Sequence, residues 1–343
     1  METSVPTHDA VGPSDAGCIT RTERSGNTAE FPDHRLSDLL VEALALGPGL
    51  RVLAIGPGDV SAQLVEEVDS IGEVITTRNR YGTPGHALSY DRIVVTTEQF
   101  DLSEAWMRQL ARHGRLVVPF RLRGATHIIA FERDGEALRS TTSRFYRTDL
   151  GDHAGPYGER RAVIDIAGER PLLTWDDDQE INPAELGRCL KRGGGKLEWT
   201  GVLVSEEDPL DALWLRLAAR ESGACHLAGG TGDWIASLAH RHGTPAIVEE
   251  STLAYLTLRP SPDSESSIIP DAEPSAERFE LGVAAYGSYA DTLSSRFAVH
   301  VRRWKSATKR TPYITAHPPT TSKMSLPRAP IIDRPDSRIV ITC

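Results

Sequence analysis

The chain has 343 residues and a formal net charge of -10 at pH 7, with 39% hydrophobic and 25% charged residues. A single core seldom extends beyond about 250 to 300 residues, so this length favours two domains, and the acidic charge argues against a phosphate backbone as the main partner. The sequence has neither an apolar run of roughly 18 residues nor a signal-peptide core, and we therefore expect a cytoplasmic protein with no nucleic-acid or membrane partner.

The N-terminal part of the chain changes character near residue 32. Residues 1–32 are rich in Ser, Thr, Gly, Pro, Asp and Glu and carry few large apolar side chains, so we expect a flexible tail. Apolar residues then recur at helical spacing from Leu36 to Leu44, with Asp33 as a plausible cap and Pro48-Gly49 as the stop. This pattern predicts an amphipathic helix that packs on a sheet.

The clearest local pattern is a short apolar strand that runs into a glycine turn. Val52–Ile55 is followed by Gly56-Pro57-Gly58, and helical spacing resumes from Ala62 to Val68. This order predicts a buried parallel strand that enters a helix. Helix N–H groups and a closely approaching glycine backbone suit nucleotide-like ligands, so Gly56 and Gly58 are candidate binding residues.

A second unit of strand, loop, helix and strand follows from Tyr90 to Phe120. Ile93–Val95 predicts a buried strand, and Asp101 with Glu104 predicts a capping pair for a helix that ends at Gly114. Leu116–Val118 predicts the next strand. We expect the two units to lie side by side and to form a crevice at the carboxyl ends of their strands.

The connection between these two units is short. Only Val74–Thr76 predicts a strand there, and the turn-prone segment 78–85, which contains Gly82, follows it. One further strand–helix–strand unit needs about 30 residues. Either a strand and its helix are deleted at this edge of the sheet, or the edge is built differently.

After Phe120 the pattern becomes antiparallel. Residues 126–141 predict a hairpin around Asp134-Gly135, and residues 160–167 and 172–175 predict further strands. The acidic run Asp176–Asp178 is interpreted as a solvated turn, since no ligand spacing predicts a metal site. The four cysteines are far apart and are interpreted as free thiols.

The sequence predicts a second domain, of α+β type, after about residue 180. Apolar residues at helical spacing predict helices near 210–217 and 293–304, and residues 338–342 predict a closing strand. The predicted organisation is a tail at 1–32, a Rossmann-like domain with an antiparallel extension at 33–180, and a C-terminal domain at 181–343 with a mobile linker at 260–277.

Two stretches resemble a known enzyme family. YDRIVVTT at 90–97, the helix with Trp106 and Leu110, and HGRLVVPF at 113–120 resemble the second half of the catalytic domain of protein-L-isoaspartate O-methyltransferases. LALGPGLRVLAIGPG at 44–58 resembles the first glycine motif of that family. Later segments are similar to a longer actinobacterial subgroup that methylates aspartate side chains in ribosomally made, modified peptides: 253–259, 280–283, 302–304, 314–318 and 338–341.

The resemblance implies an α/β fold with a class I methyltransferase sheet, S-adenosylmethionine as cofactor, and a peptide or protein as substrate, with a peptide-maturation enzyme as a possible partner. The chemistry asks the protein mainly to hold the donor and a carboxylate in line and dry. The candidate cofactor-binding residues are Ile55, Gly56, Gly58, Asp59 and Gly82. The candidate substrate residues are Thr96, Thr97 and Glu98, and no catalytic residue is assigned.

The sequence also departs from the family pattern and leaves two functions open. Ala54 and Val60 stand where the family has an acidic residue and a third glycine, and Thr76-Thr77-Arg78 stands where it has an acidic residue for the ribose. The first function is an aspartyl or isoaspartyl carboxyl O-methyltransferase. The alternative is a catalytically inactive relative that binds a peptide or a partner, and binding of the donor separates the two.

Overall fold

The computed structural model describes twelve segments of the chain, to which all structural statements refer. They are residues 36–56, 64, 72–82, 89–146, 158–166, 168–190, 195–205, 208, 210–229, 243–261, 278–307 and 312–343. The predicted tail, the predicted helix after Gly58 apart from Leu64, and most of the predicted linker at 260–277 lie outside the described residues.

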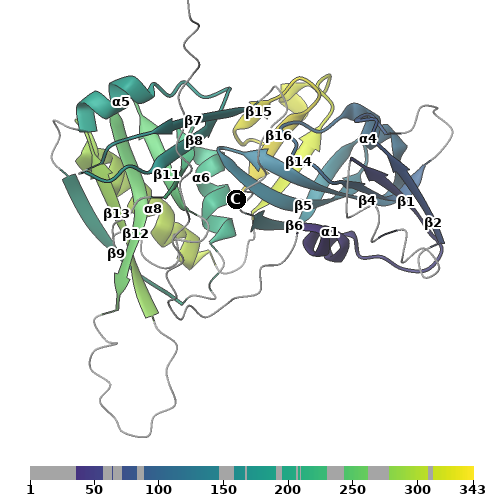
Figure 1. The fold of residues 1–343 in the computed structure, drawn as a ribbon, viewed down its shortest axis with the longest axis horizontal. Helices are drawn as coiled ribbons and strands as arrows, with labels where there is room; N and C mark the ends of the chain where they lie inside the picture. Colours follow the sequence, from purple (N-terminus) through teal and green to yellow (C-terminus); the bar gives the residue numbers. More distant parts are fainter. Residues whose placement is uncertain are drawn as a thin grey trace, which may run out of the picture. The chain divides into compact units, whose positions relative to one another are not determined.

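A nine-stranded first sheet combines strands from the N-terminal half of the chain with three from its C-terminus (Figure 1). Its order is β15-β16-β14-β6-β5-β4-β3-β1-β2, and the four strands from β4 to β2 run parallel to one another. The parallel strands are β1 (Leu50–Ile55), β2 (Gly72–Thr77), β3 (Tyr90–Val95) and β4 (Leu110–Leu122). The antiparallel strands are β5 (Ala125–Asp134), β6 (Ala137–Tyr146), β14 (Tyr313–His317), β15 (Ile331–Asp333) and β16 (Arg338–Thr342).

This sheet confirms the expected α/β class and the expected parallel pair. Val52 to Ile55 lie opposite Arg92 to Val95 in parallel register. The apolar runs form central strands because both of their faces are covered, and Leu53, Ile93 and Val94 are fully buried. Among the described residues the sheet ends at β2, which fits deletion of a third strand from this edge.

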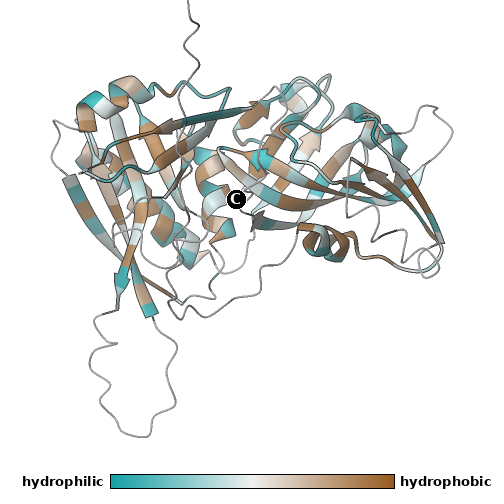
Figure 2. Ribbon diagram, in the orientation of Figure 1, coloured by the Kyte–Doolittle hydropathy of each residue, from teal (hydrophilic) through white to brown (hydrophobic). Residues whose placement is uncertain are grey.

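Helix α1 (Leu36–Leu44) forms as predicted and covers one face of the first sheet. Its apolar stripe is brown in Figure 2, and its buried residues Leu40 and Leu44 share a core with Val52, Val94 and Val117. The helix therefore packs behind the parallel strands rather than at their carboxyl ends.

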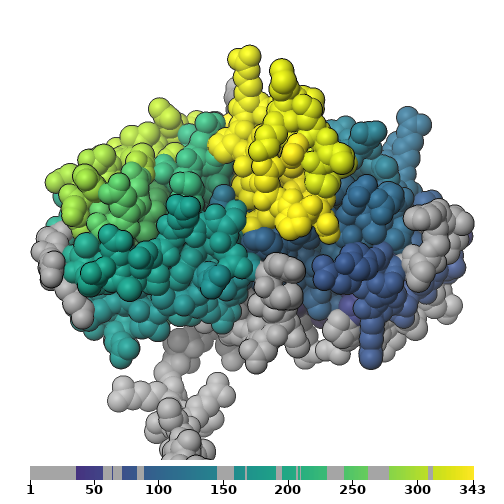
Figure 3. Space-filling model, turned by 90° about the horizontal axis from the view of Figure 1, so that it is seen from above, coloured from purple at the N-terminus to yellow at the C-terminus, as the bar shows by residue number. Residues whose placement is uncertain are grey.

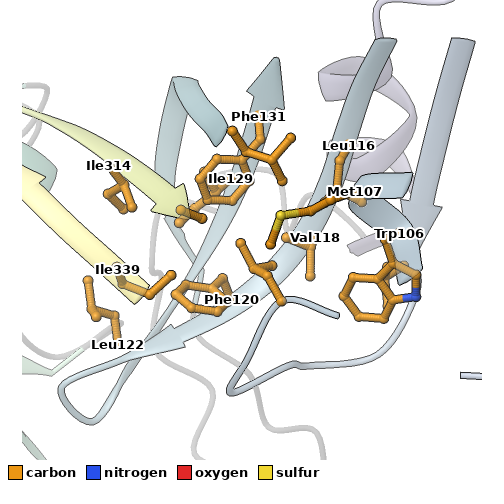
Figure 4. Packing of buried hydrophobic residues seen from close by; sticks show 14 of the residues in the cluster. Trp106, Met107, Leu116, Val118, Phe120, Leu122, Ile129, Phe131, Ile314 and Ile339 are labelled. Atoms are coloured by element: carbon orange, nitrogen blue, oxygen red, sulfur yellow. The ribbon is translucent and has the colours of Figure 1, made fainter. Parts of the chain in front are cut away.

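Helix α4 (Glu104–Gln109) is shorter than predicted. Ser103, rather than Asp101, caps it by accepting from the Ala105 amide at 3.2 Å. The helix ends at Gln109 instead of Gly114, because β4 begins at Leu110 and pairs with β3 from that residue onwards. Figure 4 shows Trp106 and Met107 of this helix packed beside the β4 side chains, on the face opposite α1.

The strands between β6 and β14 form a seven-stranded, wholly antiparallel second sheet, in the order β7-β8-β10-β11-β12-β13-β9. Its strands are β7 (Glu159–Val163), β8 (Leu172–Asp176), β9 (Gly195–Ser205), β10 (Ala224–Ala228), β11 (Thr244–Glu249), β12 (Thr252–Pro260) and β13 (Arg278–Tyr286). Helix α8 (Ala290–Ser306) packs on one face and α5 (Pro183–Leu190) on the other.

Helix α6 (Asp211–Arg220) belongs to both cores. Leu213 and Leu217 pack in the core of the second sheet, whereas Leu215 and Ala218 pack in the core of the first. Helix α6 therefore has apolar residues on two sides. None of the helices in the described segments is both long and apolar enough to cross a membrane.

The two sheets do not correspond to the two consecutive domains that we expected on either side of residue 180. β7 and β8 precede that position but pair in the second sheet, and β14 to β16 come from the C-terminus but pair in the first. A cut at 180 would divide both sheets. Sequence patterns predicted β7, β8 and β16, whereas β14 and β15 were not predicted, and such a pattern does not specify the partner of a strand.

Candidate functional site

The carboxyl ends of β1, β2 and β3 meet at one edge of the first sheet. The Gly56 amide donates to the Thr77 carbonyl at 2.9 Å, and the Thr96 amide donates to the Ile55 carbonyl at 2.9 Å. These bonds continue the parallel ladders one residue past each strand. The structure therefore brings together the glycine exit of β1 and the threonine exit of β3, as the sequence predicted.

Gly56 is the residue that allows this close approach. Its φ is +121°, in the region that favours glycine, and a Cβ at this position would collide with the Oγ1 of Thr96. Ile55, in contrast, is 2% exposed and contributes its backbone carbonyl, because its side chain is part of the core. Gly58 and Asp59 lie outside the described residues.

Gly82 lies in a turn that is attached to α4. The Gly82 amide donates to the Asn79 carbonyl at 2.9 Å, and the indole of Trp106 donates to the Arg80 carbonyl at 2.8 Å. At a φ of +82°, a Cβ on Gly82 would have the side-chain amide of Gln109 as its nearest neighbour. This turn is thus held by α4 just after β2, and its glycine is next to Gln109.

The three candidate substrate residues occupy different environments. The Thr96 side chain is buried, and the Thr97 hydroxyl accepts from the Gln99 side-chain amide at 2.9 Å. The Glu98 carboxylate accepts from Arg121 at 2.9 Å and from the Thr126 hydroxyl, and its side chain is 8% exposed. Both carboxylate oxygens of Glu98 therefore have partners within the chain, so Glu98 fixes the loop rather than facing solvent.

Arg121 is the centre of a buried charge cluster that the sequence analysis did not predict. It contacts Glu98 in the loop after β3, Glu159 in β7, and Asp176 in β8, the last at 3.4 Å from Nε. Arg334 from the C-terminal segment donates to the same Asp176 at 3.0 Å. Arg121 interrupts the apolar end of β4, and a charge inside a buried strand is the signal that could have indicated this cluster.

The interpretation of Asp176–Asp178 as a solvated turn was wrong for Asp176. This residue is fully buried, and besides Arg334 it accepts from the backbone amides of Arg123 at 2.6 Å and Gly124 at 2.8 Å. Asp176 is buried because β8 lies against the turn that follows β4, where the amides of Arg123 and Gly124 donate to its carboxylate. Asp176 therefore closes the carboxyl end of β4.

The residues at the end of β2 offer only part of a nucleoside site. Thr77 provides a hydroxyl, which accepts from the Asn79 amide at 3.1 Å. Within the described segment 72–82 the one carboxylate, Glu73, is at the start of β2 and pairs with Arg51 at 2.6 Å. A donor ribose at this edge would meet hydroxyl and amide groups of this segment rather than a carboxylate.

Comparison with known proteins finds a family that is similar to part of the first sheet. Residues 67–145 match the family model described as Protein-L-isoaspartate(D-aspartate) O-methyltransferase (PCMT). The protein-L-isoaspartate O-methyltransferase of Methanoregula boonei is 38% identical over 139 residues, covering 33% of this chain and 64% of that protein. The enzyme of the same name from Methylorubrum populi is 31% identical over 137 residues, covering 33% of this chain and 62% of that protein. The chain thus spans less than two thirds of the length of either relative.

Two solved structures are also similar in part. A protein-L-isoaspartate O-methyltransferase aligns with 82% of this chain and 76% of its own, at 16% identity and a TM-score of 0.29. A putative enzyme of this kind from Plasmodium falciparum, in complex with S-adenosyl-L-homocysteine, aligns with 33% of this chain and 69% of its own, at 14% identity and a TM-score of 0.25. The order and direction of the strands in the first sheet, and not these alignments, indicate the α/β fold.

Proposed function

We propose that this chain, whose residues 67–145 match the family model of protein-L-isoaspartate O-methyltransferases, is a carboxyl O-methyltransferase that uses S-adenosylmethionine. Its acceptor would be the side chain of an aspartyl or isoaspartyl residue in a peptide or protein. The observation that carries the proposal is the shared edge of β1, β2 and β3, where Gly56 leaves the strand in a conformation that favours glycine. Ligands of open α/β sheets bind at such edges.

The residues proposed for the donor are those around the β1 turn. Gly56 would let the donor approach the backbone, and Gly58 and Asp59 would follow in the turn, as the sequence predicts. The donor supplies an already activated methyl group, so the protein needs to align and desolvate the reactants. The Thr77 hydroxyl is proposed to face the ribose in place of the usual carboxylate, and Gly82 to support the turn beyond it.

The acceptor is proposed to bind on the β3 side of the same edge. Thr96 and Thr97 would line this side, and Glu98 would hold their loop through Arg121. The structure also supports a role for the second sheet near the acceptor, because β7 and β8 bring Glu159 and Asp176 to the end of β4. We propose that this sheet selects the peptide.

Calorimetric titration with S-adenosylmethionine and S-adenosylhomocysteine tests the proposal. We expect micromolar binding to the unaltered chain and a loss of at least tenfold in affinity for Gly56→Ala, because Ala would clash with Thr96. The matched control is Gly135→Ala, since Gly135 also has a positive φ, +64°, but a Cβ there meets nothing within 4 Å. No detectable heat with millimolar ligand would reject the donor site.

Transfer of labelled methyl groups to aspartyl and isoaspartyl peptides tests the reaction itself. Base-labile label on either peptide supports carboxyl methylation and identifies the preferred acceptor. Donor binding without transfer to any peptide would favour the inactive relative that binds a partner. The cytoplasmic location, the actinobacterial subgroup and the peptide-maturation partner remain predictions from the sequence.

A further inference from the structure

The loop Thr96–Ser103, which connects β3 to α4, is held by parts of the chain that are distant in sequence. Along β4, the Gln99 amide donates to the Pro119 carbonyl, and the Gln99 carbonyl accepts from the Arg121 amide, both at 2.8 Å. Glu98, before Gln99, pairs with Arg121 of β4, whereas Phe100 and Asp101, after it, contact the C-terminal segment. This loop carries the proposed acceptor residues, so whatever holds it also fixes the position of the acceptor side.

Asp101 ties the loop to the C-terminal segment. Its carboxylate accepts from the Ser337 hydroxyl at 2.5 Å, the Asp336 amide at 2.6 Å and its neighbour, the Leu102 amide, at 2.8 Å. Burial raises the pKa of Asp101, and these three hydrogen bonds oppose that rise by favouring the carboxylate. Since Ser337 is fully buried, water cannot replace its hydroxyl without rearrangement.

Arg334 also holds the loop, because its guanidinium stacks on the ring of Phe100 and pairs with Asp176. The guanidinium lies 3.3 Å from the ring centroid of Phe100, and it donates to Asp176 at 3.0 Å. Asp176 in turn contacts Arg121, which holds Glu98. Figure 3 shows the C-terminal residues (yellow) between the N-terminal strands of the first sheet (blue) and residues of the second sheet (teal).

We propose that Ser337 and Arg334 are positioning residues for the acceptor side of the site. They act on the loop at residues 96–103, and within the described residues no hydrogen bond or ion pair joins them to Gly56 or Thr77. The C-terminal segment thereby sets the fraction of molecules in which the loop can receive a peptide. This role rests on the proposed methyl transfer and adds the element that controls acceptor binding.

Hydrogen exchange measured by mass spectrometry tests the positioning directly. In full-length Ser337→Ala we expect the Gln99 and Leu102 amides to exchange about tenfold faster, because a hydrogen bond to the partly buried Asp101 carboxylate is lost. Ser325→Ala is the matched control, since the Ser325 hydroxyl is exposed and donates to Ser322 in the same C-terminal region. Amides of β12 and β13 should keep their rates in both variants.

A second pair of variants keeps the test valid if Ser337→Ala fails to fold. Arg334→Lys retains the charge but loses the planar group over Phe100, and it should also speed exchange in the loop. Arg338→Lys is its control, since Arg338 pairs with Asp333 and Thr321 outside the loop. Unchanged loop exchange in folded variants, or equal acceleration in every strand, would overturn the inference.

The kinetics separate positioning from simple destabilisation. With a lower fraction of competent loops, Ser337→Ala should raise the KM for the acceptor peptide about tenfold, while kcat and the KM for the donor stay within twofold. A fall in kcat with unchanged KM for the peptide would contradict this role. If the unaltered chain transfers no methyl group, the proposed function fails, but the exchange experiment still decides whether the C-terminal segment orders the loop.

Discussion

Replacing Arg121 by Met should strongly destabilise the chain, because it removes the centre of the buried charge cluster. The Arg121 side chain is 5% exposed and contacts Glu98, Glu159 and Asp176, whose side chains are 8%, 9% and 0% exposed. Asp176 would keep Arg334 and two backbone amides, and Glu98 would keep the Thr126 hydroxyl, but Glu98 would lose the guanidinium that compensates its charge.

The loss of unfolding free energy can be estimated from the carboxylates that remain buried without Arg121. Breaking a buried ion pair by removing one partner leaves an uncompensated charge and costs about 3 to 5 kcal/mol of unfolding free energy. The matched control is Arg108→Met, which breaks the exposed pair between Arg108 and Glu104, side chains 53% and 51% exposed. A helical pair of this kind contributes only about 0.3 to 0.5 kcal/mol.

Urea unfolding measures both variants. The midpoint should fall clearly for Arg121→Met with an unchanged m value, and hardly at all for Arg108→Met. Adding Glu98→Gln to Arg121→Met should lower the unfolding free energy by less than the sum of the two single changes, since the carboxylate charge that Arg121 compensates is then removed as well. Equal midpoints for Arg121→Met and Arg108→Met would refute the view that this cluster compensates buried charge.

Two further predictions concern the junction of the sheets. Complete burial lowers the pKa of His127 to about 3, so the folded state binds fewer protons than the unfolded state between that value and about 6.5. Stability should therefore fall as the pH drops through this window, by at most about 1.4 kcal/mol per pH unit from this residue, and urea midpoints of His127→Leu at pH 7 and pH 4.5 should differ less than those of the unaltered chain. Gly124→Ala should lower the melting temperature more than Gly135→Ala, because a Cβ on Gly124 would collide with the Thr174 carbonyl, whereas Gly135 has open space. Equal melting temperatures for the two glycine variants would show that β4 and β8 can separate at little cost.

The local elements and the resemblance to a methyltransferase family could be predicted from the sequence alone. Apolar runs at 52–55, 93–95 and 116–118 specified buried strands, and helical stripes at 36–44 and 293–304 specified α1 and α8. Periodicity and burial are properties of neighbouring residues, so a single chain records them directly. The glycine exit of β1 was predictable for the same reason, because a close approach of two parallel strands requires a residue without a Cβ.

Which distant groups meet could not be predicted from the sequence. Asp101 was expected to cap α4, yet its carboxylate binds Asp336 and Ser337, 235 and 236 residues further along the chain. Asp176 was expected in solvent, yet it pairs with Arg334, 158 residues away. A carboxylate has the same local pattern whether it is solvated or buried with a partner, because the compensating charge is supplied by another strand. The loop that carries the proposed acceptor residues is therefore positioned by contacts that no local pattern contains.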